Sequence, residues 1–251
     1  MDFSFQLYSA RNFPPLGDML GRLSRLGYTQ VEGYGGLYGE LDALAAGLAS
    51  SGLAMPTAHF GLAQLKDTSA AMRIAEQLGI QALFCPAIPK EDRSQDEGKW
   101  VELGETLARL GETYRKAGFG FGWHNHDFEF VPTASGRLPM DIILETAPEN
   151  EWEMDVAWVV RGNADPLPWM QKYGSRITAV HVKDIAPAGT AGDEDGWADV
   201  GHGTMDWPAL QQAIQEHTRA EYFVMEHDNP SDVNRFAERS LKAVQGWNQE
   251  R

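Results

Sequence analysis

Residues 177–184 read Ile-Thr-Ala-Val-His-Val-Lys-Asp, a run of β-formers that ends in residues able to bind a metal or move a proton. Alternate side chains of a strand point to the same face. On one face of this segment lie Ile177, Ala179, His181 and Lys183. Small or apolar residues begin that face and chemically active ones end it. The pattern is typical of a buried strand that carries part of a site at its carboxyl end.

Three further segments have the same form, a run of β-formers closed by histidines or carboxylates. They are Phe121–Asp127 (FGWHNHD), Glu153–Asp155 (EMD) and Val224–Asp228 (VMEHD). Helix-like stretches separate the four segments, and a repeat of strand, helix and strand builds parallel barrels and doubly wound sheets. Because the carboxyl ends of parallel strands lie on one rim, we expect these side chains to become neighbours there.

Eight strand-like segments alternate with eight helix-like ones along the chain. The expected strands are Phe3–Ser9, Gln30–Gly35, Met55–Phe60, Ala82–Ile88, Phe119–His126, Trp152–Trp158, Ile177–Lys183 and Glu221–His227. The expected helices are Pro15–Leu26, Leu41–Ser51, Ser69–Leu78, Gln95–Ala117, Met140–Thr146, Pro166–Tyr173, Trp207–His217 and Ser231–Val244. The length of 251 residues fits the roughly 250 residues typical of a (β/α)8 barrel. We therefore predict an α/β fold, a single (β/α)8 TIM barrel over residues 1–251.

The alternative fold is an open, doubly wound sheet. Its dinucleotide-binding form would carry G-x-G-x-x-G after the first strand, where this chain has Ala10-Arg-Asn-Phe-Pro-Pro15, so a dinucleotide site is not expected. The stretch Ile185–Thr204 is rich in Gly, Asp and Ala and too polar for a regular element. Loops of that length are usually functional or disordered.

Composition narrows the class of protein. The formal net charge of −15, from 21 basic and 36 acidic residues, disfavours a nucleic-acid partner, because affinity for phosphate backbones comes largely from Lys and Arg. The one cysteine, Cys85, excludes an internal disulfide. The first residues lack the pattern of a signal peptide, and no run of about 18 apolar residues could span a bilayer. We expect a soluble cytoplasmic protein without a membrane partner; the oligomeric state, homo-oligomer included, stays open.

Four inward-facing residues on the last four strands could bind one metal ion. They are His124, Asp155, His181 and Glu226. Two imidazoles and two carboxylates suit Mn²⁺, Co²⁺, Zn²⁺ or Fe²⁺. A single strand histidine is more often a hydrogen-bonded core residue. However, Asp155 and Glu226 lie between apolar neighbours, where a carboxylate is seldom buried without a partner, so the set as a whole favours a metal site.

Other polar residues near the expected rim each have two interpretations. Lys183 either forms an ion pair with one of the carboxylates or has an electrostatic or catalytic role, which we favour. Glu32 is either a substrate-binding rim residue or a structural hydrogen-bond acceptor, and Trp158 belongs either to the core or to the wall of a substrate pocket. The remaining residues that we expect to contact substrate are His59, Asn125 and His202.

Several short strings resemble one known family. They are Gln6-Leu-Tyr-Ser9, Val31-Glu32, Ala58-His59, Val180-His-Val-Lys-Asp184, Gly201-His-Gly-Thr-Met-Asp-Trp207 and Met225-Glu226. In this order the strings are similar to the sugar phosphate isomerase/epimerase group with the xylose isomerase-like TIM barrel. The string HNHDFEF at residues 124–130 resembles one subgroup of it. The similarity covers nearly the whole chain, but no single string identifies a substrate.

The resemblance implies a divalent metal, Mn²⁺ first, with Mg²⁺, Co²⁺, Zn²⁺ or Fe²⁺ as alternatives. In that family a carboxylate on strand five, an Asp, a His and a Glu hold the ion, and the last three correspond to Asp155, His181 and Glu226. Strand five has His124 instead, which is our candidate for the fourth ligand, with Glu129 as the fallback. The family's His three residues after the strand-six Asp is Trp158 here, which makes the pocket more apolar.

The chemistry that the resemblance implies is removal of a proton next to a carbonyl, through an enediolate. Glu226 would act as base with His124 or His126 opposite it. We therefore expect first an isomerase/epimerase of a keto-sugar or related polyol, and second a lyase, dehydratase or hydratase of a keto-sugar or inosose. A non-catalytic sugar-binding barrel and an abasic-site endonuclease are further alternatives; the latter would need a basic face, which the charge argues against.

Overall fold

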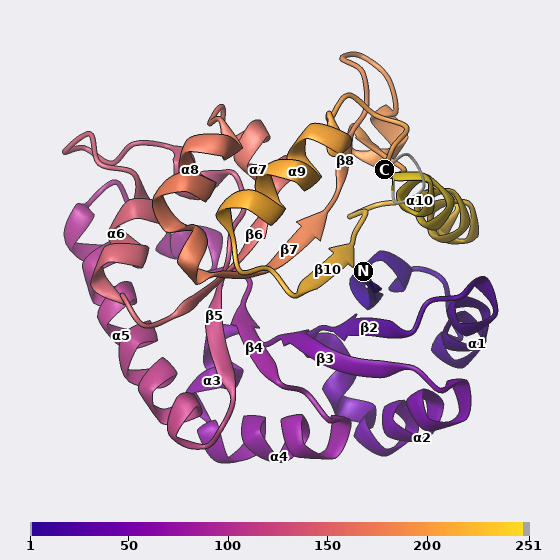
Figure 1. Ribbon diagram of the computed structural model, residues 1–251. Coiled ribbons are helices and arrows are strands. Elements are labelled where there is room, and N and C mark those ends of the chain that lie inside the picture. Colours follow the sequence, from indigo (N-terminus) through magenta and orange to yellow (C-terminus); the bar gives the residue numbers. More distant parts are fainter. Residues whose placement is uncertain (1, 248–251) are drawn as a thin grey trace.

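In the computed structural model, which describes residues 2–247, eight parallel strands close into a barrel, as predicted (Figure 1). Around the barrel the order is β1-β10-β7-β6-β5-β4-β3-β2. The strands are β1 Phe3–Gln6, β2 Gln30–Gly33, β3 Ala54–His59, β4 Ala82–Cys85, β5 Gly120–His124, β6 Glu151–Asp155, β7 Ile177–Val182 and β10 Tyr222–Met225. Consecutive strands in sequence are neighbours in space, and the last pairs with the first through Ser4 and Val224.

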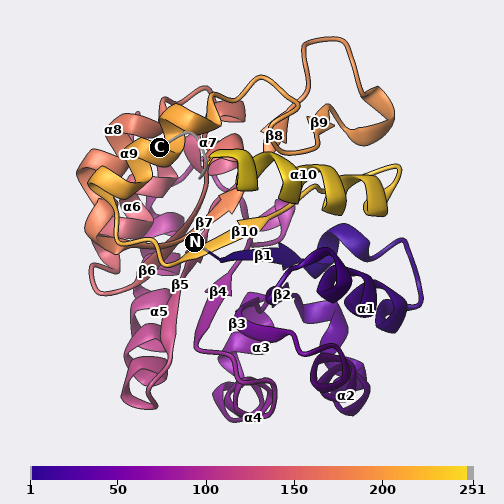
Figure 2. The ribbon, with the colours of Figure 1, turned by 45° about the vertical axis from the view of Figure 1, so that its right-hand side comes forward.

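Helices surround the barrel on the outside, as Figures 1 and 2 show. They are α1 Leu16–Leu26, α2 Leu41–Ser51, α3 Leu62–Lys66, α4 Thr68–Leu78, α5 Glu97–Lys116, α6 Pro139–Thr146, α7 Val156–Arg161, α8 Pro166–Tyr173, α9 Trp207–His217 and α10 Val233–Trp247. Helix α1 is typical: Met19, Leu20 and Leu23 recur at helical spacing and are buried, and Gly27 ends the helix at φ 105°, where a side chain would be strained. None of the described helices is long and apolar enough to cross a bilayer.

All eight predicted strands extended past the observed ends, and at three of them the difference bears on the site. The strand predicted to reach Trp158 ends at Asp155, because the Asp155 side chain accepts a hydrogen bond from the Trp158 N–H (2.9 Å) and starts α7. The strand predicted to reach His126 ends at His124. The last strand ends at Met225, so Glu226 follows it, although the Glu226 N–H still donates to the Val182 carbonyl (3.2 Å).

The segment after β7 differs from the prediction that Ile185–Thr204 has no regular element. It contains the two-stranded antiparallel sheet β8 Asp184–Ile185 and β9 Trp197–Ala198, which Figure 2 shows beyond the barrel rim above α10. The buried Asp184 carboxylate accepts four backbone N–H groups, at 2.9–3.1 Å, from Ile185, Gly201, Gly203 and Met205. These side-chain hydrogen bonds order a stretch whose composition is polar.

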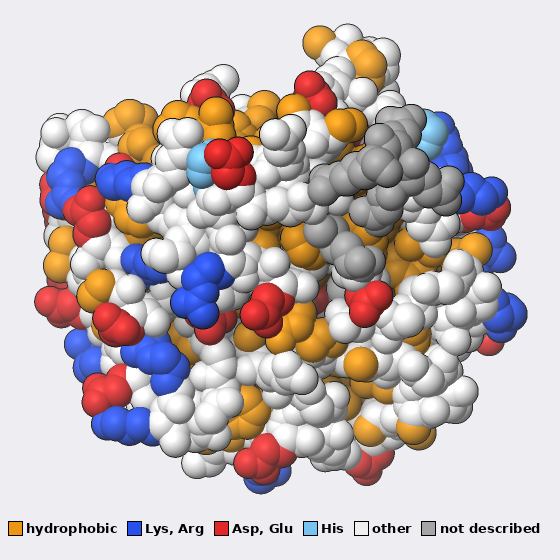
Figure 3. Space-filling model, viewed as in Figure 1, with side chains coloured by type: hydrophobic (Ala, Val, Ile, Leu, Met, Phe, Trp, Pro, Cys, Tyr) orange, Lys and Arg blue, Asp and Glu red, His pale blue; other side chains and the backbone are white. Residues whose placement is uncertain are grey.

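The barrel interior is apolar mainly at its floor. Ala82, Phe84 and Ala179 form a small buried cluster there, with Tyr222 packed against it. Above this floor the fully buried side chains are polar: Ser4, Gln6, Glu32, Thr57, Glu153, Asp155, His181 and Lys183. TIM barrels are usually filled by branched apolar residues, so this polar interior indicates a functional site. On the outside, acidic and basic side chains are interspersed over the face in Figure 3.

Candidate metal centre and active site

Four neighbouring strands bring the predicted metal ligands together at the rim. The residues are His124 on β5, Asp155 on β6, His181 on β7 and Glu226 after β10. Each offers one ligand atom, all of these atoms lie within 4.8 Å of one another, and all four residues are buried. The His181 Nδ1 lies 3.0 Å from Glu226 Oε2 and 3.9 Å from Asp155 Oδ2. Such separations suit donors that surround one cation at about 2.1 Å.

Two observations on these side chains fit a divalent cation. Asp155 Oδ2 is buried without a hydrogen-bond partner, a costly arrangement that a cation would relieve. Burial lowers the pKa of His124 to about 3, so its ring is neutral and has a lone pair to offer. Burial acts to lower the pKa of His181, but Glu153, Glu226 and Glu32 raise it well above its ordinary value. A cation must therefore displace a proton from His181.

Asn125, which we predicted to contact substrate, is not among the residues that line the cavity described below. Asn125 follows His124 and points to the other face, where it is fully buried. Its Oδ1 accepts hydrogen bonds from the Asp155 N–H (3.0 Å) and Trp152 Nε1 (2.9 Å), and its Nδ2 donates to the Asp155 carbonyl (3.1 Å). Asn125 therefore fixes the backbone that carries Asp155.

Lys183 is the centre of a buried ion-pair cluster. Its Nζ lies 2.6 Å from Asp228 Oδ2, 3.2 Å from Glu226 Oε2 and 3.7 Å from Asp155 Oδ2. The rings of Trp158 and Trp197 lie 5.0 and 4.2 Å away, so Trp158 walls this cluster. Burial acts to lower the pKa of Lys183, but the carboxylates raise it above its ordinary value. We predicted for Lys183 either an ion pair with a carboxylate or an electrostatic or catalytic role. Its contacts in the structure are ion pairs.

A second group lies directly beneath the first. Ligand atoms of His59, His124, Glu153 and His181 also lie within 4.8 Å of one another. His59 Nε2 lies 2.5 Å from Glu153 Oε2. Glu153 was not predicted as a site residue, although it shares a strand face with Asp155, two positions later. Glu32, predicted as a candidate for substrate contact, is fully buried and bonded to His181, which is the structural alternative.

Glu129, the fallback ligand, belongs to neither group of potential ligands. It lies in the 3-10 turn Phe128–Phe130, where its Oε1 accepts from Trp123 Nε1 (2.9 Å) and its Oε2 from the His126 N–H (3.0 Å). Burial raises its pKa to about 8. The geometry favours His124 over Glu129 at the strand-five position.

A cavity of about 430 Å³ opens beside the four donors, a volume in the range of small-molecule sites. Its lining consists of Tyr8, Arg11, Tyr34, Gly35, His59, Gly61, Pro86, Ala87, His124, His126, Asp195, Glu226 and Asp228. His126 stands against Trp158, with ring centres 5.2 Å apart. Asp195 comes from the segment after β7, at a φ of 57°; no sequence pattern had selected it. His202, predicted to contact substrate, is exposed and does not line this cavity.

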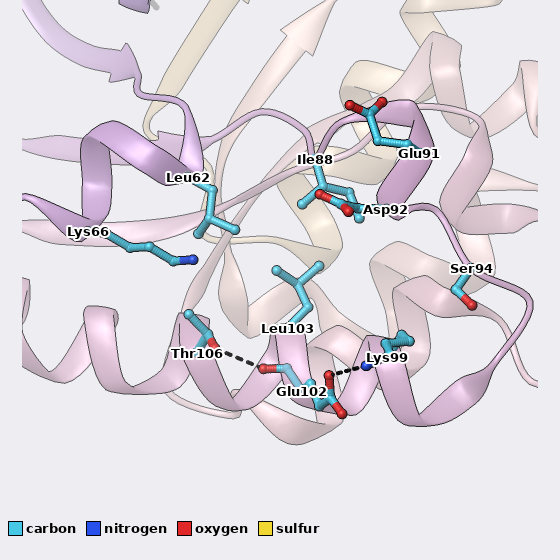
Figure 4. Close-up of a pocket in the computed structure, with 10 residues that line it drawn as sticks. All are labelled: Leu62, Lys66, Ile88, Glu91, Asp92, Ser94, Lys99, Glu102, Leu103 and Thr106. Carbon is cyan, nitrogen blue, oxygen red and sulfur yellow. Dashed lines mark hydrogen bonds and ion pairs between the residues drawn. The ribbon is translucent and has the colours of Figure 1, made fainter.

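A second hollow lies away from this chemistry, between α3, the turn after β4 and α5 (Figure 4). Three of its polar residues pair with one another: Lys99 Nζ donates to Glu102 Oε2 (2.8 Å), and Thr106 Oγ1 donates to the Glu102 carbonyl (2.9 Å). Among the described residues, neither group of potential metal ligands lies there. The cavity at the strand ends is therefore the candidate active site.

Comparison with known proteins agrees with this architecture. The family model of the Xylose isomerase-like TIM barrel matches residues 20–249. The chain belongs to this family. Among solved structures, a sugar phosphate isomerase/epimerase from Parabacteroides distasonis superposes with a TM-score of 0.79 at 22% identity, covering 97% of this chain and 93% of the other. The probable 3-DHS dehydratase AsbF of Bacillus anthracis does so with a TM-score of 0.75 at 14% identity, covering 98% and 99%. At these identities the likeness shows the fold.

Curated relatives share the name inosose dehydratase. The protein of Lacticaseibacillus casei is 26% identical over 186 residues, which are 68% of this chain and 61% of the relative. Inosose dehydratase 2 of Bacillus cereus is 31% identical over 125 residues, 48% of this chain and 41% of the relative. The chain thus spans about three fifths, or less, of the length of these relatives.

Proposed function

We propose that this protein is a divalent-metal-dependent lyase that removes water from a keto-sugar or cyclic keto-polyol. The single observation that carries the proposal is the buried His124–Asp155–His181–Glu226 group beside a cavity of sugar size. Mn²⁺ is the cation that we expect first. The sequence alone had placed isomerisation or epimerisation first. We now place elimination first because relatives matched over two thirds of the chain are named inosose dehydratase.

The proposed reaction begins with loss of the proton next to the substrate carbonyl. A bound divalent cation would supply Lewis-acid polarisation of that carbonyl, a contribution of several kcal/mol. Burial acts to raise the pKa of Glu226, but Lys183 and His181 hold it well below its usual range. Glu226 therefore stays anionic, as a metal ligand must, and faces the cavity.

His126 is our candidate to take the proton, because its ring lines the cavity. Burial, followed by the nearby His124 and Lys183, holds the pKa of His126 well below its ordinary value. Its neutral ring lines the cavity, and its Nδ1 is buried without a hydrogen-bond partner. In the proposed step His126 accepts the α-proton, the electron pair forms the new double bond, and the β-hydroxyl leaves with the same proton as water. His124 has no part in this proton transfer, because in the proposal it is a ligand of the cation.

The lining of the cavity favours an uncharged substrate. Two tyrosines, Tyr8 and Tyr34, offer ring faces and hydroxyls, and Asp195 and Asp228 offer carboxylates that accept hydrogen bonds from sugar hydroxyls. Arg11 is the basic residue of this lining, and its guanidinium is already stacked 3.9 Å over Tyr8 and donates to the Asp228 carbonyl. A phosphate would meet more negative than positive charge there.

Isomerisation or epimerisation is the second candidate function. It requires two groups that can exchange a proton with the same carbon, and Glu226 and His126 both line the cavity. The acidic net charge, −15, makes an abasic-site endonuclease less favoured than either of these two functions.

A product screen in D₂O tests the proposal. The Mn²⁺-loaded protein is incubated with a panel of inososes and keto-sugars, and products are analysed by mass spectrometry. We expect a product lighter by one water. Deuterium incorporation without loss of water would instead support the isomerase or epimerase. Binding without either change would favour a non-catalytic sugar-binding barrel.

A further inference from the structure

Two fully buried carboxylates lie beneath the candidate metal centre and have no role in the proposed reaction. They are Glu32 at the end of β2 and Glu153 within β6. Neither lines the cavity. Burying a carboxylate costs free energy unless it is paired or hydrogen-bonded, so what these two contact should explain their presence.

The two ring nitrogens of His181 face opposite sides. Nδ1 lies 3.0 Å from Glu226 Oε2, on the side of the four donors, and Nε2 lies 2.8 Å from Glu32 Oε1, on the inner side. An imidazole that binds a cation through one nitrogen is oriented by the hydrogen bond that the other nitrogen donates, which also fixes the tautomer. Glu32 is placed to accept that bond.

Glu32 is itself held in place. Gln6 Nε2 on β1 donates to Glu32 Oε1 (2.6 Å), and His59 Nε2 lies 3.2 Å from the same oxygen. Neighbouring strands on both sides thus fix the carboxylate, since β2 pairs with β1 and β3. A carboxylate so constrained can hold the His181 ring at one angle.

In the second group of potential ligands, His59, His124, Glu153 and His181, the shortest contact is a hydrogen bond and not the spacing of two ligands of a cation. Two donors that share an ion at about 2.1 Å lie roughly 3 Å or more apart. Within this group His59 Nε2 and Glu153 Oε2 are only 2.5 Å apart, whereas Glu153 Oε2 lies 3.1 Å from His124 Nδ1 and 3.4 Å from His181 Nε2. His181 Nε2 and Glu32 Oε1, at 2.8 Å, are likewise at hydrogen-bond distance. At the four donors of the candidate metal centre, His181 Nδ1 lies 3.0 Å from Glu226 Oε2 and 3.9 Å from Asp155 Oδ2. These distances leave room for an ion.

We propose that Glu32 is a positioning residue for the metal centre. Its carboxylate accepts a hydrogen bond from the His181 Nε2–H and so orients Nδ1 toward the cation. The inference rests on the proposed function only in requiring a cation at the four donors. It assigns Glu32 to metal affinity and not to substrate. Loss of a residue that hydrogen-bonds to a metal ligand typically weakens metal binding 10- to 100-fold.

A Co²⁺ titration of the metal-free protein tests the role of Glu32. Visible absorption reports the ligand geometry, and equilibrium dialysis reports affinity and stoichiometry, so no substrate is needed. The variants are Glu32→Ala, which removes the acceptor, and Glu32→Gln, which keeps its shape and an acceptor oxygen. Glu151→Gln is the matched control. Glu151 lies at the opposite end of β6 from Asp155, and its carboxylate accepts a hydrogen bond from Thr178 Oγ1 (2.9 Å).

We expect one Co²⁺ per wild-type chain, a 10- to 100-fold weaker affinity in Glu32→Ala and a smaller loss in Glu32→Gln. Glu151→Gln should bind as the wild type does. Equal affinity in Glu32→Ala and the wild type, or an equal loss in Glu151→Gln, would overturn the inference. So would two Co²⁺ per wild-type chain with one lost in Glu32→Ala, since Glu32 would then be a ligand. Should Glu32→Ala not fold, Glu32→Gln decides by the same criteria. A wild type that binds no Co²⁺ would instead refute the proposed function at its first step.

Discussion

Lys183 is fully buried, and its ammonium group lies within 4 Å of three carboxylates, those of Asp155, Glu226 and Asp228. Removing one partner of a buried ion pair leaves uncompensated charge. In Lys183→Met the flexible apolar chain keeps its place beside Trp158 and Trp197, so the lost charge dominates the effect. We expect the free energy of unfolding of the metal-free protein to fall by about 3–5 kcal/mol, measured by urea denaturation.

The matched control is Lys172→Met. Lys172 is 53% exposed and pairs with Asp141 on the surface (2.6 Å), where an ion pair is worth about 0–1 kcal/mol. If Lys183→Met were no less stable than Lys172→Met, the buried cluster would not depend on the ammonium group.

Single residues show what strand alternation can and cannot predict. Alternation, together with carboxylates between apolar neighbours, gave Asp155, His181 and Glu226 from the sequence. It assigns a face but no depth along the barrel axis. Glu153 shares the face of Asp155 one layer lower and was therefore passed over. The hydrogen bonds of Asn125 to the Asp155 backbone could not be predicted, because they depend on how β5 and β6 lie side by side.

At the scale of elements, the segment between β7 and α9 depends on one side chain. Asp184 Oδ2 accepts the N–H groups of Gly201 and Gly203, and its Oδ1 accepts those of Ile185 and Met205. In Asp184→Asn an amide NH₂ replaces one oxygen and faces two N–H donors. We expect amide hydrogen exchange in residues 197–205 to become at least about tenfold faster, while β7 exchanges as before.

Asp206→Asn is the control for this change. Asp206 caps α9, where its Oδ1 accepts a hydrogen bond from the Ala209 N–H (3.2 Å). Asn caps helices as well as Asp does. Exchange in residues 197–205 should not change in this variant. Unaltered exchange in Asp184→Asn as well would mean that contacts other than the Asp184 carboxylate order the segment.

Elements with a hydrophobic period could be predicted, and elements without one could not. The apolar spacing of α1 and the apolar runs of the barrel strands placed both kinds of element near their true positions. Strands β8 and β9 are two residues each and carry no period. They exist because Asp184 gathers four N–H groups and because Glu194 and Asp199 pair with Arg235 on α10 (2.7 and 3.0 Å).

For the whole molecule, the alternation of eight strands with eight helices, together with the length of 251 residues, predicted the closed barrel. Closure then explains the site, because side chains from β5, β6, β7 and β10 converge only when these strands are neighbours around the barrel. Substrate identity does not follow from this logic. The cavity lining comes largely from segments after the strands, such as Tyr34 and Asp195, whose positions depend on local contacts and not on the repeat.

The most direct measurement is an anomalous-difference map from crystals grown with Mn²⁺ and recorded near the manganese absorption edge. A cation held by the last four strands predicts one strong peak bounded by His124, Asp155, His181 and Glu226, and its loss in Glu226→Gln. No peak at that position, with manganese bound elsewhere on the protein or not at all, would contradict a metal centre built from these four side chains.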